Sequence, residues 1–520
     1  MPSRGVTAVV LALGSGEALH PLTGDDEPGD LPVPLEVPDD PPAGHEAAAP
    51  RDRRASETPS EASGGGHSSH DPGPGEGDDL PPHKDYGACE ALLPVANRPL
   101  LHYPLRSLEE LFAEDPDGMA RCTIVVPGEV QARAVRGYLL QRYKGSPARP
   151  EVVVAEGGAS EGEALRGLMT QGRLAGDNVL VVRGSLVTDL PLREVAAQHL
   201  VRGPVLTAVL SPRSSPVEQK LGKAPKNVRY IGLSDDSPQQ LVFWGGAVPG
   251  SIKELALTKG MLFPTKSATI RIDLADSEIY LFARDALETV LREDPHVELL
   301  GDHLIPRFVR KQFLRPAPPS GHRRLDSVDM EKLPDPAVLK RDEQEAYLED
   351  LIKQMSHVDS KEAVKAHCAV YVGGERAYCM NVHSLQTYSE VSRDLANPMM
   401  AKIHGHTLAG KNNFVADSVE LGNKSTIGGG CIVGDGTRMG EKSSIKRSVI
   451  GANCQLGNNV KVVNSVLMDG VVVEDGSHVQ NCTICPNVEV QAKSSLKDCQ
   501  IARNYVVPAG SDERGEVLTV

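Results

Sequence analysis

The strongest constraint on the fold is a repeat in the last quarter of the chain, where apolar residues return at nearly every sixth position. The steps run as six, six and five residues, which gives a unit of 17 residues. No α-helix has this period, but a parallel β-helix with three short strands per coil does. The predicted inward positions are Val415, Leu421, Ile427, Val433, Met439, Ile445, Ile450, Leu456, Val462, Leu467, Val473, Val479, Ile484, Val490, Leu496 and Ile501. We therefore predict a parallel β-helix over residues 406–520, a type of solenoid that commonly serves assembly.

The first part of the chain alternates apolar runs with amphipathic stretches. In "PLLHYPLRSLEELF", the residues Leu101, Leu105, Leu108 and Leu111 recur at helical spacing. Candidate strands cover residues 6–13, 123–126, 151–155, 178–182 and 205–210. This alternation predicts an α/β domain over residues 1–313, with a parallel, helix-covered sheet that binds ligands at the carboxyl ends of its strands.

An acidic, proline-rich segment at residues 24–85 interrupts this pattern. It holds 16 Asp and Glu against 4 Lys and Arg, so its net charge of −12 accounts for most of the formal charge of −15. With 12 prolines and no Phe, Tyr or Trp, the segment cannot bury enough apolar surface to offset its ordering entropy. We predict a disordered insertion in a surface loop, which either has no function or serves as a regulatory tail.

The remaining segment, residues 314–405, is predicted to be a linker and helical connector. A predicted helix in this segment carries an apolar stripe that includes Tyr347, Leu351 and Met355. No run approaches the ~18 apolar residues of a membrane span, and no basic cluster with interleaved aromatic residues suggests nucleic-acid binding. The nine cysteines form no dense framework, which favours a reduced, cytosolic setting. Cys482 and Cys485 make a lone C-x-x-C pair, which we interpret as structural thiols rather than a zinc site, so no metal or other cofactor is expected.

The stretch "GSGEALHPLT" at residues 14–23 follows the first predicted strand. Gly14 and Gly16 allow the backbone to approach a phosphate closely. The sequence then offers Glu17 and Ala18 where a phosphate-handling loop is expected to carry a positive charge.

Together with the hexapeptide coils, this loop resembles the nucleotidyltransferases that make nucleotide sugars, whose fold is Rossmann-like and is followed by a left-handed β-helix. The runs "ALLPVANRPLLHYPL" at residues 91–105 and "VLVVRGSLVTDLPLREV" at residues 179–195 extend the resemblance. In the active enzymes the loop supplies an arginine, a second motif a lysine, and a Gly-Asp pair a magnesium-binding carboxylate. These groups meet the charge that accumulates on phosphate oxygens.

This sequence departs from the family at all three positions. Ala18 replaces the arginine, Glu90 replaces the lysine with the opposite charge, and Ser185 replaces the metal-binding aspartate. Asp189 lies four residues beyond the expected position, where it is expected to orient a turn or a helix start. The resemblance therefore implies a degenerate domain without catalytic residues, in which Gly14 and Gly16 are relics of a phosphate loop.

A degenerate nucleotidyltransferase domain joined to hexapeptide coils is similar to the gamma and epsilon subunits of eukaryotic translation initiation factor 2B. The runs "LIPRFVRKQF" (residues 304–313), "AVYVGGERAYCMNVHSLQTYSEVSRDL" (residues 369–395) and "GEKSSIKRSVIGANC" (residues 440–454) carry this resemblance, which is closer to gamma. The epsilon subunit carries a further exchange domain after the coils, and the ending "GSDERGEVLTV" leads us to expect none here.

The resemblance implies a non-catalytic cytosolic subunit that supports GDP release from translation initiation factor 2. Its partners would be the epsilon subunit and the alpha, beta and delta regulatory subunits, with no direct contact to nucleic acid or membrane. The chain has no G-x-x-x-x-G-K-[ST] loop of a GTPase. Two alternatives stay open. One is an active nucleotidyltransferase of the mannose-1-phosphate guanylyltransferase type, and the other is a stand-alone assembly protein or regulator that binds a nucleotide or sugar without turnover.

Overall fold

The computed structural model describes residues 5–14, 19, 89–113, 121–155, 159–213, 229–237, 239–245, 267–313, 367–374, 376–406 and 412–519. The predicted insertion at residues 24–85 and the predicted helix near Leu351 lie outside these ranges. All described residues belong to one unit, Met1–Gly24 with Asp85–Val520. No helix within the described ranges has the length and apolar character needed to cross a bilayer.

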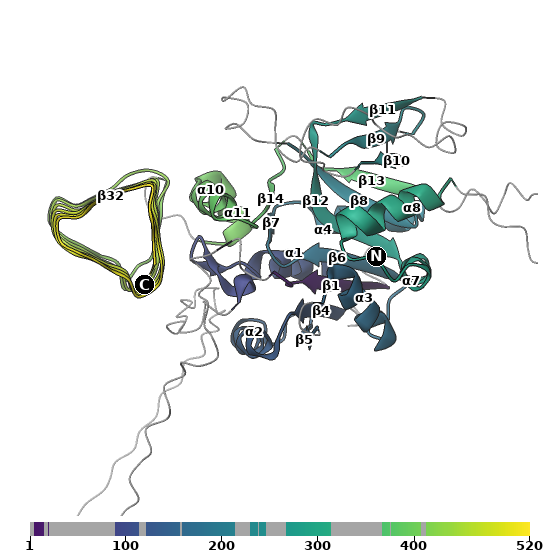
Figure 1. The fold of residues 1–520 in the computed structure, drawn as a ribbon, viewed down its shortest axis with the longest axis horizontal. Helices are drawn as coiled ribbons and strands as arrows, with labels where there is room; N and C mark the ends of the chain where they lie inside the picture. The colour runs from purple at the N-terminus through teal and green to yellow at the C-terminus, as the bar shows by residue number, and fades with distance from the viewer. Residues whose placement is uncertain are drawn as a thin grey trace, which may run out of the picture. The chain divides into compact units, whose positions relative to one another are not determined.

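A seven-stranded sheet forms the centre of the α/β part (Figure 1). In spatial order its strands are β13 (Cys368–Val372), β8 (Leu206–Pro212), β12 (Leu274–Ala283), β6 (Asn178–Arg183), β1 (Val6–Leu11), β4 (Arg121–Val126) and β5 (Pro150–Val154). All five strands predicted from the sequence are present, which confirms the α/β class. The sheet is mixed rather than wholly parallel, because β12 runs antiparallel to both β6 and β8.

Helices cover both faces of this sheet because its strands alternate their buried side chains between two cores. In β1, for example, Val6, Ala8 and Val10 face one core, whereas Val9 and Leu11 face the other. The first core is completed by α1 (His102–Phe112), α2 (Glu129–Arg142) and α4 (Leu192–Arg202). The second is completed by α3 (Glu161–Thr170), α7 (Arg284–Glu293) and α8 (Ile305–Lys311).

Short elements extend the α/β part. They are the sheet of β10 (Leu241–Trp244), β9 (Ile231–Ser234) and β11 (Ala268–Arg271), the pair of β14 (Cys379–Asn381) with β7 (Leu186–Thr188), the hairpin of β2 (Pro94–Val95) and β3 (Arg98–Pro99), and the single turns η3 (Glu90–Leu92) and η4 (Leu300–Leu304).

The structure differs from the expected boundary at residue 313. β13 pairs in parallel with β8 at the edge of the central sheet, and β14 pairs with β7. Residues 368–372 and 379–381 therefore belong to the α/β sheets rather than to a connector. Pairing between strands so distant in the chain depends on tertiary contacts, which the local sequence pattern does not reveal.

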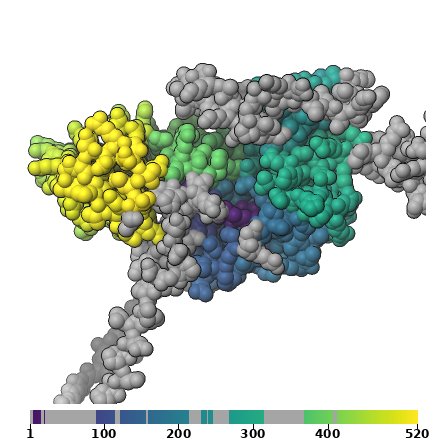
Figure 2. All heavy atoms as spheres, viewed as in Figure 1, coloured from purple at the N-terminus to yellow at the C-terminus, as the bar shows by residue number. Residues whose placement is uncertain are grey.

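The C-terminal part is a left-handed β-helix, as predicted. Its coils, seen end-on, outline a triangle in Figure 1, and the last coil lies at the yellow surface in Figure 2. One sheet contains β15 (Phe414–Val415), β18 (Ile432–Val433), β21 (Val449–Ile450), β24 (Val466–Leu467), β27 (Thr483–Ile484), β30 (Gln500–Ile501) and β33 (Val517–Leu518). We call it the first face.

Two six-stranded sheets complete the triangle. The second face contains β16 (Glu420–Leu421), β19 (Arg438–Met439), β22 (Gln455–Leu456), β25 (Val472–Val473), β28 (Glu489–Val490) and β31 (Val506–Val507). The third face contains β17 (Thr426–Ile427), β20 (Ser444–Lys446), β23 (Lys461–Val463), β26 (His478–Gln480), β29 (Ser495–Lys497) and β32 (Asp512–Arg514).

The predicted inward residues stack in register from coil to coil. Ile450, for example, lies between Val433 and Leu467 and is fully buried. The first described coil is the exception, since Leu421 is 55% exposed and Val415 and Ile427 are only partly buried. The inward residues join one core with α10 (Leu385–Leu395), and η7 (Pro398–Met400) and α11 (Ala401–His404) lead from α10 toward the coils.

Candidate functional site

The candidate site lies at the carboxyl edge of the central strands, where a parallel sheet usually binds its ligand. β1 ends at Leu11 and β6 ends at Arg183, and these two residues are direct neighbours in the sheet. Of the predicted phosphate loop, the structure describes Gly14, whereas Gly16 and Ala18 lie outside the described residues.

The carboxylate of Glu90 lies directly against Gly14. An added Cβ at Gly14 would lie 1.6 Å from Glu90 Oε2, so only glycine leaves room for this side chain. Glu90 opens the turn η3, which is held by a bond of 3.1 Å from the Leu93 amide to the Glu90 carbonyl and by the burial of Ala91 and Leu92. A negative charge therefore occupies the space beside the glycine that a phosphate would need.

Ser185 follows β6 at the same edge of the sheet. The preceding Gly184 donates its amide to the Leu11 carbonyl at 2.8 Å, and the Ser185 carbonyl accepts the Val382 amide at 3.0 Å. Asp189 accepts the Tyr378 amide at 2.7 Å, so it joins the start of β14 to the end of β7. It does not begin a helix, because α4 is preceded by Pro191.

A cluster of charged side chains adjoins these positions around a cavity of about 70 Å³. Arg183 forms ion pairs with Glu161 and Glu278. The other carboxylate oxygen of Glu161 accepts the Leu300 amide at 2.8 Å. Both carboxylates are therefore committed to partners within the chain.

A second arginine in the cluster is held in the same way. Arg229 lies 2.9 Å from Asp302 and 3.8 Å from Asp276, and its guanidinium stacks over Trp244 at 5.1 Å from the ring centre. Tyr280 donates its hydroxyl to Asp276 at 2.5 Å. The two arginines of the cluster are therefore neutralised by carboxylates of the chain rather than presented to a ligand.

Burial shifts the titration of these groups. Burial raises the pKa of Glu278 to about 7, against the opposing effect of the Arg183 charge. Burial alone would lower the pKa of Arg183, but the charges of Glu278, Glu161, Tyr280 and Glu90 raise it above its ordinary value. Glu90 makes the smallest of these contributions to the pKa of Arg183.

Glu278 owes its position to an irregularity in β12. The register of β12 against β8 shifts between Asp276 and Tyr280, and Glu278 adopts a left-handed backbone with φ of +54°. Such a conformation in a non-glycine residue costs free energy, and the ion pair with Arg183 offsets part of it.

The sequence prediction missed this cluster. Arg183 lies two residues before Ser185, so a charged residue at the end of a buried strand was the available signal. Glu161, Asp276 and Glu278 carried no comparable signal, because their segments meet Arg183 only in the folded chain.

The segment at residues 91–105, which shares in the resemblance to nucleotidyltransferases, contacts the β-helix. It forms the β2–β3 hairpin, whose turn residues Ala96 and Asn97 have φ of +50° and +60°. Asn97 Nδ2 donates to the Ile450 carbonyl at 2.7 Å, and the Tyr388 hydroxyl of α10 donates to the Pro94 carbonyl at 2.6 Å. The hairpin thus joins the α/β part to α10 and to the coils.

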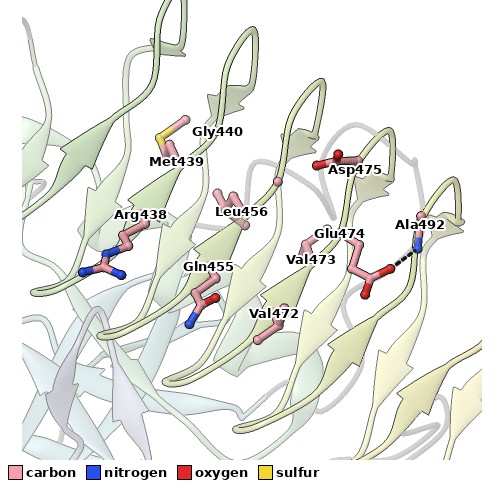
Figure 3. Close-up of a pocket in the computed structure, with 11 residues that line it drawn as sticks. Arg438, Met439, Gly440, Gln455, Leu456, Val472, Val473, Glu474, Asp475 and Ala492 are labelled. Carbon is pink, nitrogen blue, oxygen red and sulfur yellow. Dashed lines mark hydrogen bonds between the residues drawn. The ribbon is translucent and has the colours of Figure 1, made fainter.

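A larger hollow of about 530 Å³ lies on the second face of the β-helix (Figure 3). Figure 3 shows Arg438 and Gln455 on the opposite side of their strands from Met439 and Leu456. Arg438 pairs with Glu420 at 3.1 Å, and Glu474 accepts the Ala492 amide at 2.9 Å. These mixed and partnered charges indicate a surface groove rather than a catalytic site.

Within the described residues, no group of three or more His, Cys, Asp or Glu is arranged to hold a metal ion. Cys482 and Cys485 are both buried in the coils, and burial raises the pKa of each thiol to about 12. Such thiols are protonated at neutral pH and are poor metal ligands.

Comparisons with known proteins agree with this architecture. Residues 410–512 match the family model described as "EIF2B subunit epsilon LbH domain". The translation initiation factor eIF2B subunit gamma of Dictyostelium discoideum is 26% identical over 387 residues, which cover 70% of this chain and 82% of that protein. The chain is related to the gamma subunits of eIF2B. The gamma subunit of Schizosaccharomyces pombe is 25% identical over 236 residues, 43% of this chain and 47% of the relative.

Proposed function

We propose that this chain is a non-catalytic, gamma-type subunit of an initiation factor 2B complex. In this role it would support the release of GDP from translation initiation factor 2 in the cytosol. The observation that carries the non-catalytic part is the carboxylate of Glu90 against Gly14. The names of the relatives in Dictyostelium discoideum and Schizosaccharomyces pombe support the assignment to this complex.

Electrostatics argues against nucleotidyl transfer at this edge of the sheet. Transfer to a sugar phosphate builds negative charge on phosphate oxygens, and one well-placed arginine can be worth on the order of 10³–10⁵ in rate. Here Arg183 and Arg229 are paired with carboxylates, and Glu90 adds a negative charge. Ser185 offers a hydroxyl where the family carries a magnesium-binding carboxylate, which leaves the metal without its ligand.

Scaffolding is the role we assign to the two parts of the chain. The α/β domain and the β-helix would hold the epsilon subunit and join the alpha, beta and delta subunits, with no direct contact to nucleic acid or membrane. We propose an α/β domain over residues 1–313, a connector over residues 314–405 and a β-helix over residues 406–520. Strands β13 and β14 lie within the connector range but belong to the sheets of the α/β domain.

The test of the non-catalytic assignment is a pyrophosphate-release assay. The purified chain is incubated with sugar 1-phosphates, nucleoside triphosphates and Mg²⁺, beside a heat-treated sample and an active guanylyltransferase. We expect no release above the heat-treated sample. Turnover approaching that of the active enzyme would restore the guanylyltransferase alternative.

The test of the scaffolding assignment is co-purification with the epsilon subunit, followed by a GDP-release assay on translation initiation factor 2. We expect the chain to recover epsilon and to raise the rate of release above that of epsilon alone. A chain that recovers no epsilon would instead support a stand-alone assembly protein or regulator.

A further inference from the structure

The three faces of the β-helix differ in the side chains that they turn outward. On the first face the outward residues Ile432, Val449, Val466 and Thr483 are buried. Ser389 of α10 lies 2.9 Å from Thr483, hydroxyl to hydroxyl, so α10 covers part of this face. The first face is therefore used within the chain.

The third face and its two corners carry exposed cations in successive coils. We call this surface the basic face and define it by Lys442, Lys446, Arg447, Lys461, Lys493 and Lys497, with His478 among them. Within the described part of the chain, none of the six Lys and Arg residues has a carboxylate within ion-pair distance. By contrast, Arg438 on the second face is paired with Glu420, and Arg514 in the last coil of the third face, which we leave out of the basic face, is paired with Asp512.

The coils hold these cations in fixed columns. Lys461 lies beside His478 in the next coil, and Lys446 lies three coils from Lys497 in a column that also holds Val463 and Gln480. Neighbouring parallel strands are about 4.8 Å apart, so Lys446 and Lys497 are separated by about 14 Å along the β-helix. The face is thus a strip of positive charge on rigid, in-register strands.

This strip is notable in a chain whose formal net charge is −15. Several cations on one surface without carboxylate partners create a positive potential, which favours binding of an oppositely charged partner. A surface on which cations are separated by uncharged side chains, such as Val463 and Gln480 between Lys446 and Lys497, suits an extended or helical segment that presents several carboxylates.

We propose that the basic face binds an acidic polypeptide segment, rich in Asp and Glu, on a partner protein. A polypeptide fits better than a nucleic acid because single-stranded nucleic acid binding usually relies on Phe, Tyr or Trp side chains that stack with bases, and the strands of the described third face carry none of these three.

The experiment measures binding of a short fluorescent polyglutamate peptide to the full chain by anisotropy, at low and at physiological salt. The test variant combines Lys446→Glu, Lys461→Glu and Lys497→Glu. The matched control combines Arg121→Glu, Arg133→Glu and Lys144→Glu, which reverse three exposed cations in the α/β domain.

We expect the natural chain to bind the peptide in a salt-sensitive manner, and the test variant to bind about tenfold more weakly. The control should stay within about twofold of the natural chain. If the reversed charges prevent folding, as judged by thermal unfolding, the same three positions are changed to Gln, and an intermediate loss of binding is expected.

Equal binding by the test variant and the natural chain would overturn the proposal. So would an equal loss in both triple variants, which would reflect net charge rather than this face. Tighter binding of a polyadenylate of equal length would replace the polypeptide partner with a nucleic acid.

Discussion

Replacing Ile450 with aspartate should unfold the coils while leaving the central sheet intact. Ile450 is fully buried between Val433 and Leu467. Its carbonyl accepts both the Gly434 amide at 2.9 Å and the Asn97 side chain at 2.7 Å. The substitution therefore acts where the coils meet the hairpin of the α/β part.

The expected magnitude follows from burial. Losing a fully buried isoleucine removes roughly 1.5–3 kcal/mol of apolar transfer free energy. An unpaired carboxylate in the same place costs several kcal/mol more. The sum is comparable with the ~5–15 kcal/mol that separates folded from unfolded domains, so neighbouring coils should lose their order together.

Hydrogen exchange and denaturant unfolding measure this effect. We expect loss of amide protection in the coils, in α10 and in the β2–β3 hairpin, since these elements share one hydrophobic core. The central sheet should keep its protection, because its two cores contain separate residues. Gln455→Asp, an exposed change on a neighbouring strand, is the control and should unfold like the natural chain. Equal protection of the coils in Ile450→Asp and Gln455→Asp would refute the reasoning.

Three further predictions concern the hairpin, the ion-pair cluster and the insertion. Asn97→Gly keeps a residue suited to the positive φ but removes the hydrogen bond to the Ile450 carbonyl. Denaturant unfolding should therefore show a free energy of unfolding about 1 kcal/mol lower than that of the natural chain. An unchanged free energy would mean that this hydrogen bond does not contribute to stability. The pKa of Glu278 is raised from 4.5 to about 7, so the folded state binds the extra proton and stability should fall as pH rises between these values. Because about a third of the Glu278 side chain is exposed, the free energy of unfolding should fall by at most ~1–2 kcal/mol over this pH range. Denaturant midpoints measured across the range should show a flatter pH dependence for Glu278→Gln than for the natural chain. An unchanged pH dependence in Glu278→Gln would show that Glu278 is not its cause. Replacing residues 26–84 with a short Gly/Ser linker should leave the thermal unfolding transition cooperative, because this acidic segment has little apolar surface to bury; loss of the transition would place it in the core.

Periodic patterns in the sequence predicted the regular parts of the molecule. The 17-residue repeat placed Ile450, Val473 and Ile484 inside the coils, and all three are buried there. The helical spacing of Leu101, Leu105, Leu108 and Leu111 predicted α1, and these residues are likewise buried. Such patterns are readable because they follow from the geometry of one strand or one helix.

The candidate site was predictable only in part. The resemblance to nucleotidyltransferases indicated Glu90 and Ser185 as altered positions, and the structure places both at the carboxyl edge of the sheet. No local pattern indicated that the Glu90 carboxylate would lie against Gly14, since the two residues are 76 positions apart.

Local periodicity in the sequence thus determined the coils of the β-helix, the parallel strands of the central sheet and helix α1, because each of these depends on residues close together in the chain. The antiparallel direction of β12, the addition of β13 to the sheet and the pairing of Arg183 with Glu161 and Glu278 were decided only when distant segments met. The residue pattern of an apolar strand buried on both sides does not indicate whether the strand runs parallel or antiparallel to its neighbours. The partner of a charged side chain is determined by which opposite charge is buried beside it in the folded chain.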